Sequence, residues 1–207
     1  THGVSAPAYF PTVADLKVKG RAQADLHARA ASVARATFGA RVYLRAVVEV
    51  SNYCRENCHY CGMRRDNRSL ARYRAHADQL ADLLIHHRPR SITDVNIQTG
   101  EDPVAVREVV LPLVAALRRE TNLGISVCLG TLTPTLYQDL FAAGASIYIM
   151  KFELAGPGRY GQMEAPGTLP ERVEHIRQLS AGGWGVSSGF IAGLPGQTDA
   201  DLLENFY

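Results

Sequence analysis

The stretch Val42-Tyr-Leu-Arg-Ala-Val-Val-Glu-Val50 leads directly into Ser51-Asn-Tyr-Cys-Arg-Glu-Asn-Cys-His-Tyr-Cys61. Its first part is rich in β-branched and apolar residues, which is typical of a strand buried in a parallel sheet. Its second part places Cys54, Cys58 and Cys61 four and then three residues apart. The stretch therefore predicts a buried strand that ends in a loop of closely spaced thiols.

Further strands and helices alternate along the rest of the chain. Apolar periodicity and turn residues predict strands over 92–97, 125–129, 146–152 and 186–192. They predict helices over 16–38, 75–87, 102–120, 133–143 and 168–181, with one more from residue 198. Asp102 and Thr133 each precede a proline, and Thr168 with Glu171 fits a capping box, so three helix starts are marked. Five strands that alternate with helices through short loops predict parallel βα units.

The position of the unusual residues favours a barrel over a doubly wound sheet. They follow the strands in the order 54–61, 99–103, 130–131, 151–153 and 189–196. Each group lies at the carboxyl end of a strand, the face where barrel enzymes keep their active sites. We therefore expect an α/β, TIM-type (βα) barrel of parallel strands.

The expected barrel is incomplete, because about five βα units cannot close it and would leave a bare edge strand. We expect a helical extension over residues 1–40 and a partial barrel over 41–207, truncated at the C-terminus. The chain is interpreted as a fragment of a longer protein or as a truncated gene product.

Composition excludes several classes of protein. Of the 207 residues, 46% are hydrophobic and 20% are charged, and the net charge is +2, so neither nucleic acid nor membrane is indicated as a partner. Three of the four cysteines share one loop, which makes a poor disulfide framework and favours a reducing compartment. No apolar run approaches the roughly 20 residues of a spanning helix, and no leader is recognised. A cytoplasmic location is predicted.

The cysteine loop admits more than one inorganic centre. A [4Fe-4S] cluster normally takes four thiolates, so three would leave one iron open for another ligand. A zinc knuckle needs four ligands, yet His59 lies between two of the cysteines and Cys128 lies on another strand, where we expect a small buried apolar residue. A cluster is favoured over zinc and over a disulfide. A truncated, non-catalytic iron–sulfur or zinc binding protein stays as an alternative.

The CxxxCxxC spacing, with Tyr60 directly before the last cysteine, resembles the signature of radical S-adenosylmethionine (radical SAM) enzymes. The resemblance implies that Cys54, Cys58 and Cys61 hold a [4Fe-4S] cluster whose open iron chelates S-adenosylmethionine. It implies an enzyme that cleaves this cofactor reductively into methionine and a 5′-deoxyadenosyl radical.

The resemblance extends to other strand ends. Gln98-Thr-Gly-Glu-Asp-Pro103 looks like the family's glycine–glutamate motif, which implies that Glu101 meets the methionyl amino group. Gly189-Phe-Ile-Ala-Gly-Leu-Pro-Gly-Gln197 is similar to the motif that contacts adenine. The cofactor contacts implied in this way are Tyr60, Thr99, Gly100, Glu101, Lys151, Glu153, Arg172, Ile191 and Leu194. No side chain is predicted to be catalytic in its own right, and Lys151 stands where arginine is expected.

The sequence around the cysteines resembles one family within this superfamily. Together with Cys61-Gly-Met-Arg-Arg-Asp-Asn67 and Arg72-Tyr-Arg74, it looks like the HydE family of [FeFe] hydrogenase maturases. That resemblance implies a role in hydrogenase cofactor maturation, with a small-molecule or iron-complex substrate. It implies an electron donor such as flavodoxin or ferredoxin, and other maturation proteins as partners. Another biotin synthase-like enzyme, of the methylornithine synthase type, is the alternative.

A basic stretch follows the cysteines, formed by Arg64, Arg65, Arg68, Arg72 and Arg74. Such a run is typical of a solvated face, which could also attract an anionic substrate or a reductase. Only Tyr73 interleaves with it as an aromatic platform, so single-stranded nucleic acid is not indicated.

Overall fold

The computed structural model describes residues 11–207 and divides into two compact units. The sheet unit comprises residues 43–190, and the terminal unit comprises residues 11–42 together with 191–207. The first ten residues of the expected N-terminal extension lie outside the described part. The boundary expected between residues 40 and 41 stays a prediction.

The sheet unit is built on five parallel strands in the order β1-β2-β3-β4-β5. The strands are β1 (Leu44–Ser51), β2 (Ile92–Thr99), β3 (Gly124–Cys128), β4 (Ile147–Ile149) and β5 (Gly185–Ser187). Sequence neighbours are therefore spatial neighbours throughout, as in a barrel that is wound one βα unit at a time. The predicted partial barrel is confirmed.

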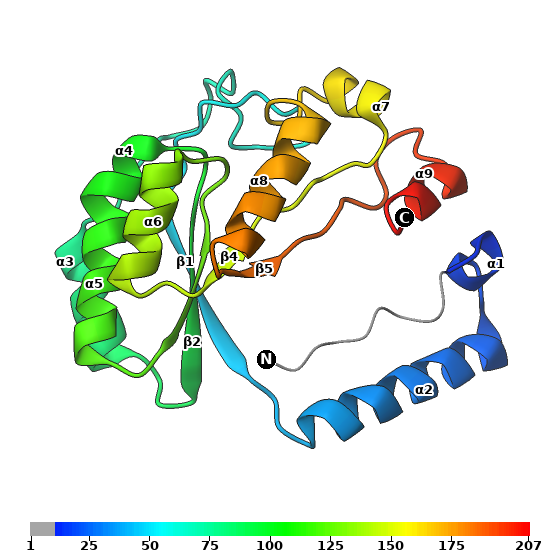
Figure 1. Ribbon diagram of the computed structural model, residues 1–207, viewed down its shortest axis with the longest axis horizontal. Helices are drawn as coiled ribbons and strands as arrows, with labels where there is room; N and C mark the ends of the chain where they lie inside the picture. Colours follow the sequence, from blue (N-terminus) through cyan, green and yellow to red (C-terminus); the bar gives the residue numbers. More distant parts are fainter. Residues whose placement is uncertain (1–10) are drawn as a thin grey trace. The chain divides into compact units, whose positions relative to one another are not determined.

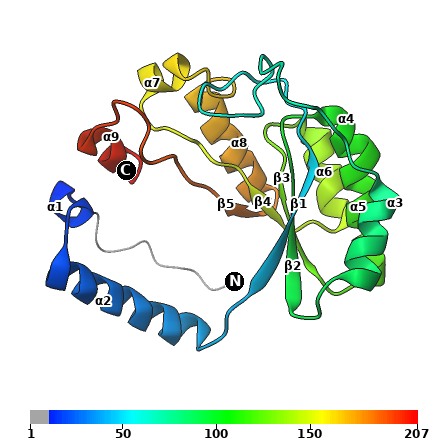
Figure 2. The same ribbon diagram turned by 180° about the vertical axis from the view of Figure 1, so that it is seen from behind.

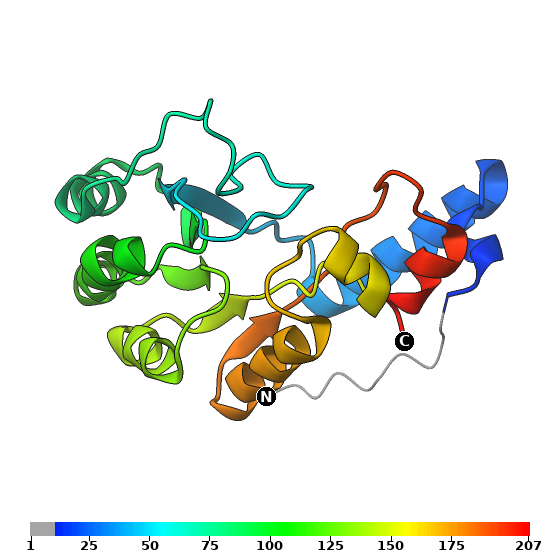
Figure 3. The same cartoon turned by 90° about the horizontal axis from the view of Figure 1, so that it is seen from above.

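Helices cover one side of this sheet. They are α3 (Ala77–Asp82), α4 (Pro103–Ala105), α5 (Leu111–Glu120), α6 (Pro134–Ala143) and α8 (Leu169–Ala181), with π-helical turns η1 (Leu83–His87) and η2 (Val106–Val110). Helix α7 (Pro157–Gln162) lies beyond the end of β4 (Figure 1). Figure 1 and Figure 2 show α3, α5 and α6 stacked along the same face, and Figure 3 shows α8 continuing this outer layer around the curved sheet. The predicted N-caps form, since Asp102, Thr133 and Thr168 accept from Ala105, Leu136 and Glu171 backbone N–H groups.

The core lies between the sheet and these helices. Alternate strand residues such as Val50, Ile97 and Val127 are fully buried there against Leu113 and Leu117 of α5. Because side chains alternate across a strand, the residues between them face the opposite side. On β2 and β3 that opposite face carries the polar residues Asn96, Gln98 and Ser126.

Two strands are shorter than predicted. The expected strands over 146–152 and 186–192 are reduced to β4 and β5, and beyond them only an isolated bridge joins Glu153 to Phe190. Past β4 the chain turns at Glu153, which adopts φ 68°. Helix α7, which no sequence signal predicted, follows this turn.

The terminal unit contains α1 (Val13–Leu16), α2 (Gly20–Phe38) and α9 (Asp199–Glu204). The single helix expected from residue 16 to 38 is interrupted before Gly20, and Gly39 ends α2 at φ 68°. An ion pair joins Lys17 to Asp199, so α1 and α9 belong to one cluster. Nowhere in residues 11–207 does a helix have the length and apolar character needed to cross a bilayer.

Candidate metal centre

The cysteine loop, residues 52–74, follows β1 directly. Its three cysteines are free thiols, with Cys58 buried and Cys54 and Cys61 half-buried. The Glu101 backbone N–H donates to Cys54 Sγ at 3.3 Å, and the Cys61 N–H donates to the Cys58 carbonyl at 3.0 Å. In residues 11–207 no three His, Cys, Asp or Glu side chains gather closely enough for a single metal ion. A cubane cluster places each thiolate on a different iron, so its ligands do not have to converge on one point.

Burial controls the acidity of Cys54 and Cys58. It raises the pKa of Cys58 to about 11, although the nearby Tyr60 hydroxyl acts in the opposite direction. It also raises the pKa of Cys54 against the backbone N–H groups of Glu56 and Glu101. Metal ligands must be deprotonated, so a bound metal supplies the positive charge that thiolates need here.

Two polar side chains close the loop on itself. The Arg72 guanidinium donates only to backbone carbonyls, those of Asn52, Met63, Arg64 and Asn67. Asn52 Nδ2 donates to the Ala71 carbonyl at 2.8 Å, and its Oδ1 accepts from the Tyr73 N–H at 2.8 Å. Arg72 is therefore structural, and treating the whole basic stretch as a solvated face was wrong for this residue.

The loop also packs closely against the end of β2. A side chain at Gly100 would place its Cβ 2.2 Å from the Tyr53 carbonyl oxygen and 2.7 Å from Cys54 Cβ. Next to it, Asp102 accepts from Ser51 Oγ at 2.7 Å and from Arg74 at 2.7 and 3.0 Å. Burial acts to raise the pKa of Asp102, but the hydrogen bonds from Arg74 and Ser51 outweigh it and hold this pKa below its usual value.

Glu101 is buried and fully engaged. Its Oε1 accepts from the Thr131 N–H at 2.8 Å and from Arg172 Nη1 at 3.3 Å, while its Oε2 accepts from Arg55 at 3.1 and 3.2 Å. A Cβ at Gly130, which has φ 71°, would lie 2.1 Å from Glu101 Cγ, so only glycine fits there. The carboxylate is thus held in place by groups that follow β1 and β3 and by Arg172 of α8.

Glu153, beyond the end of β4, is equally buried, at 6% exposure, but incompletely paired. Its Oε1 lies 3.8 Å from Lys151 Nζ, and its Oε2 is buried with no hydrogen-bond partner among the described residues. Burial raises the pKa of Glu153, although Lys151 and Arg172 act against that change. Glu153 in turn contributes to the raised pKa of Tyr60, whose main cause is burial, so this carboxylate lies within electrostatic reach of the cysteine loop.

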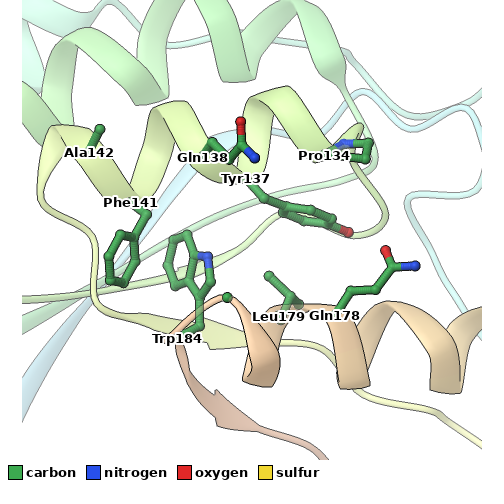
Figure 4. A pocket seen from close by; sticks show the side chains of 9 residues that line it. Pro134, Tyr137, Gln138, Phe141, Ala142, Gln178, Leu179 and Trp184 are labelled. Atoms are coloured by element: carbon green, nitrogen blue, oxygen red, sulfur yellow. The ribbon is translucent and has the colours of Figure 1, made fainter.

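The sheet unit contains a polar and an apolar cavity that differ in their relation to these residues. A polar one of about 270 Å³ is lined by Arg55, Glu56, Glu101, Thr131, Pro166, Gly167, Glu171, Arg172 and His175. An apolar one of about 240 Å³ lies between α6 and α8, where Figure 4 shows Tyr137, Phe141 and Trp184 grouped. Only the polar cavity contains residues that the sequence marked as candidates.

The structure brings most predicted site residues together. Glu101 and Arg172 are in contact, as are Lys151 and Glu153, and the Lys151 carbonyl accepts from Arg172 Nε at 2.9 Å. Ile191 and Leu194 belong to the terminal unit, so their contact with adenine stays a prediction.

Sequence reasoning missed Arg55 and the hydroxyl of Thr131, which accepts from Arg172 Nη1 at 2.7 Å. The available signal for Thr131 was its place after Gly130 at a strand end. The only sequence signal for Arg55 was its position beside Cys54.

Comparison with known proteins agrees with this geometry. The Radical SAM superfamily model matches residues 48–206. This chain belongs to the radical SAM superfamily. The family uses a [4Fe-4S] cluster and S-adenosylmethionine, and the chain carries the CxxxCxxC cysteines that the cluster requires.

Individual relatives lie in the biotin synthase-like group of radical SAM proteins. The chain is 31% identical over 176 residues to the [FeFe] hydrogenase maturase subunit HydE of Thermotoga maritima, covering 84% of the chain and 49% of that protein. It is 30% identical over 189 residues to a biotin synthase of Streptomyces avermitilis, covering 88% of the chain and 48% of that protein. The chain thus spans about half the length of these curated relatives.

A solved radical SAM structure supports the fold. The crystal structure of methylornithine synthase superposes with a TM-score of 0.84 at 21% identity, covering 96% of this chain and 60% of that one. The residues present here fit both cofactors, since three free thiols share one loop and a buried carboxylate oxygen nearby has no protein partner.

Proposed function

We propose that this chain carries the S-adenosylmethionine-cleaving half of a biotin synthase-like radical SAM enzyme. The observation that supports this most directly is the Oε2 atom of Glu153, which is buried without a partner within electrostatic reach of the cysteine loop. Burial of an unpaired carboxylate oxygen destabilises a protein unless a ligand donates a hydrogen bond to it or pairs with its charge. The ammonium group of a bound methionyl moiety would do so.

The two glutamates receive different roles in this proposal. Glu153 takes the methionyl ammonium, because the oxygens of Glu101 already accept from Arg55, Arg172 and the Thr131 N–H. Glu101 holds Arg172 in place and donates its backbone N–H to Cys54 Sγ. Its predicted contact with the cofactor is therefore indirect.

The methionyl carboxylate needs cations. Lys151 offers an ammonium that is half exposed, and Arg172 has an Nη2 group to spare, since its Nε and Nη1 carry its hydrogen bonds. Both lie beside Glu153, so a zwitterionic group would meet matched charges. Tyr60, Thr99 and Gly100 complete the proposed contacts from the loop and the end of β2.

The cluster, when bound, supplies the electron that splits S-adenosylmethionine into methionine and a 5′-deoxyadenosyl radical. The protein's part is to bind, orient and exclude water. Cys54, Cys58 and Cys61 would hold the cluster, and the charges of Glu153, Lys151 and Arg172 would orient the methionyl group of the bound cofactor.

Anaerobic reconstitution with iron and sulfide tests this proposal. With dithionite and S-adenosylmethionine, the protein is expected to release 5′-deoxyadenosine, and Cys58→Ala is expected to lose both the product and the bound iron. Cys128→Ala is the matched control, because it removes a thiol outside the loop and is expected to keep its iron. A protein with a verified cluster that never yields 5′-deoxyadenosine contradicts the proposal and favours a non-catalytic iron–sulfur protein. A stoichiometric zinc content with no iron favours the zinc alternative.

Within this group we propose a HydE-like role in [FeFe] hydrogenase maturation. The support is the 31% identity to HydE across 84% of the chain, beside the similar identity to biotin synthase. The proposed partners are a low-potential donor such as flavodoxin or ferredoxin, other maturation proteins, and a small-molecule or iron-complex substrate. Addition of the protein to a hydrogenase maturation mixture that lacks HydE is expected to restore hydrogenase activity, and failure there with intact cofactor cleavage would favour a methylornithine synthase-type enzyme.

A further inference from the structure

The sheet face opposite the helices of the sheet unit carries a row of polar side chains in register. Glu49 of β1 pairs with Gln98 of β2, and Gln98 pairs with Cys128 of β3. Register partners on adjacent parallel strands point to the same face, and Val50, Ile97 and Val127 beside them are buried against the helices. Glu49, Gln98 and Cys128 therefore form one layer on the inner side of the partial barrel, which we name the inner layer.

Hydrogen bonds connect this layer to Asn96 and Ser126, which lie two residues earlier on β2 and β3. Ser126 Oγ donates to Asn96 Oδ1 at 3.1 Å, and Asn96 Nδ2 donates to Gln98 Oε1 at 3.0 Å. Gln98 Nε2 then donates to Glu49 Oε1. Every amide is oriented by its neighbours, so the chain of donors ends on the Glu49 carboxylate.

That carboxylate lacks a cation. Among residues 11–207 no lysine, arginine or histidine lies within ion-pair distance of Glu49, and its only side-chain hydrogen bond is with an uncharged amide. The acidic residues at the β2 end differ, because Glu101 and Asp102 are both paired with arginine. Glu49 is exposed, unlike those two residues, and it offers a negative charge without a partner cation on the inner face of the sheet.

The inner layer adjoins the proposed cofactor residues. Burial raises the pKa of Cys128, Lys151 and Arg172 act to lower it, and Glu153 and Glu49 act to raise it. All four charged groups thus lie within electrostatic reach of this one thiol. Cys128 is half-buried among polar groups, which corrects its interpretation as a buried apolar residue.

We propose that Glu49, Gln98 and Cys128 form the substrate-facing wall of the radical site, and that this wall takes a small polar molecule bearing an ammonium or another cationic group on Glu49. Its Cys128 lies within electrostatic reach of Lys151 and Glu153, two of the proposed cofactor contacts. A cation on Glu49 completes the hydrogen-bond chain and balances the charge. This inference rests on the proposed function for its link to radical chemistry, but its charge preference can be measured without a cluster.

Charged thiol reagents measure that preference directly on the full chain. Cys128 is labelled with the cationic 2-(trimethylammonium)ethyl methanethiosulfonate or the anionic 2-sulfonatoethyl methanethiosulfonate, and each rate is divided by the reagent's rate with free cysteine. The tryptic peptide 120–151 contains Cys128 as its only cysteine, so mass spectrometry reads this site alone. Glu49→Gln is expected to lower the cation-to-anion ratio by roughly fivefold to thirtyfold, because removal of a unit charge changes both rates in opposite directions.

Glu108→Gln is the matched control, since it removes an exposed carboxylate from η2 on the helical side and is expected to leave the ratio unchanged. A second measurement needs no variant. Butylammonium is expected to slow labelling of Cys128 by neutral methyl methanethiosulfonate at least twofold, whereas butanol, its uncharged counterpart, is expected to have no effect.

An unchanged ratio in Glu49→Gln, or equal protection by butylammonium and butanol, would overturn this inference. Such a result beside normal release of 5′-deoxyadenosine would leave the proposed function intact. A clear cation preference in a protein that never cleaves S-adenosylmethionine would support the cationic wall and refute the proposed function alone.

Discussion

The ends of β2 and β4 each carry a glutamate that is 6% exposed, yet the two carboxylates are treated in opposite ways. Glu101, after β2, accepts from two arginines and a backbone N–H. Glu153, after β4, has one distant lysine and an oxygen with no partner, on a backbone at φ 68°. In the proposed function the first arrangement stabilises the protein, whereas the second leaves binding capacity for a ligand. Burial is the same for both carboxylates, so the proposal separates their roles by the completeness of their pairing.

The largest expected effect comes from breaking the complete site. Glu101→Ala leaves Arg172, which is 5% exposed, as an uncompensated buried cation, and is expected to lower the free energy of unfolding by about 3 to 5 kcal/mol. Urea denaturation of the cluster-free chain measures this, with Glu108→Ala as a control expected to change stability by less than about 0.5 kcal/mol. Equal stability of the two variants would show that the Glu101 network is not structural.

Glu153→Gln is the opposite case. It is expected to leave the fold intact but to weaken S-adenosylmethionine binding by roughly tenfold to a hundredfold, because hydrogen bonds to charged groups contribute about 1.5 to 3 kcal/mol. Equilibrium binding to the reconstituted protein measures the affinity, and denaturation of the same variant measures its stability. A variant that unfolds easily and binds normally would reverse the roles assigned to the two strand ends.

Acidity separates the same two regions. Because folding lowers the pKa of Asp102, this carboxyl stabilises the folded protein above its ordinary pKa of 3.8. That stabilisation is lost as the pH falls through the pKa of the folded state. Because folding raises the pKa of Glu153, this carboxyl contributes its full stability below its ordinary pKa of 4.5. That contribution is lost as the pH rises through the pKa of the folded state. Asp102→Asn is therefore expected to lower the free energy of unfolding most near neutrality and little in strong acid. For Glu153→Gln, the free energy of unfolding is expected to rise relative to that of the parent protein as the pH rises.

Stability curves from pH 3 to 7 for both variants and the parent check this contrast. Parallel curves for the two variants would contradict it, since they would mean that neither carboxyl changes its acidity on folding.

The smallest expected effect concerns the cysteine loop. Arg72→Lys keeps the charge but cannot reach four carbonyls at once, so it is expected to destabilise the loop by about 1 kcal/mol and to speed tryptic cleavage after Arg64, Arg65 and Arg68 several-fold. Cleavage of the cluster-free chain is compared with that of Arg107→Lys, an exposed arginine on η2. Identical cleavage rates in the two variants would remove Arg72 from the account of loop order.

Much of the fold could be predicted because local signals agreed. Apolar strands, proline after Asp102 and Thr133, and the capping box at Thr168 all marked element starts that the structure confirms. The strands β4 and β5 were overestimated because apolar residues continue past them. Pairing between them stops at Ile149 and Ser187 apart from the bridge between Glu153 and Phe190, and apolar periodicity does not mark where pairing stops.

The candidate site was only partly visible in the sequence. The cysteines and strand-end motifs could be found from spacing, but Arg55, Arg72 and Thr131 act through contacts between distant segments. Arg72 looked like one charge in a basic run because its acceptors are carbonyls, which carry no sequence signal. The assignment of Glu49 likewise depends on strand register, which only the folded chain provides.

Asp102 joins three segments through one carboxylate, since it caps α4 at the Ala105 N–H, binds Arg74, and accepts from the Ser51 hydroxyl that itself accepts from the Tyr53 N–H. Local opening of any one of these hydrogen bonds weakens the others. The first turn of α4 and the entrance to the cysteine loop therefore form one cooperative unit, and the amide protons of Tyr53 and Ala105 should exchange with deuterium at a common rate. Fraying of the first turn of α4 and disordering of the three thiols in the cysteine loop would then occur together.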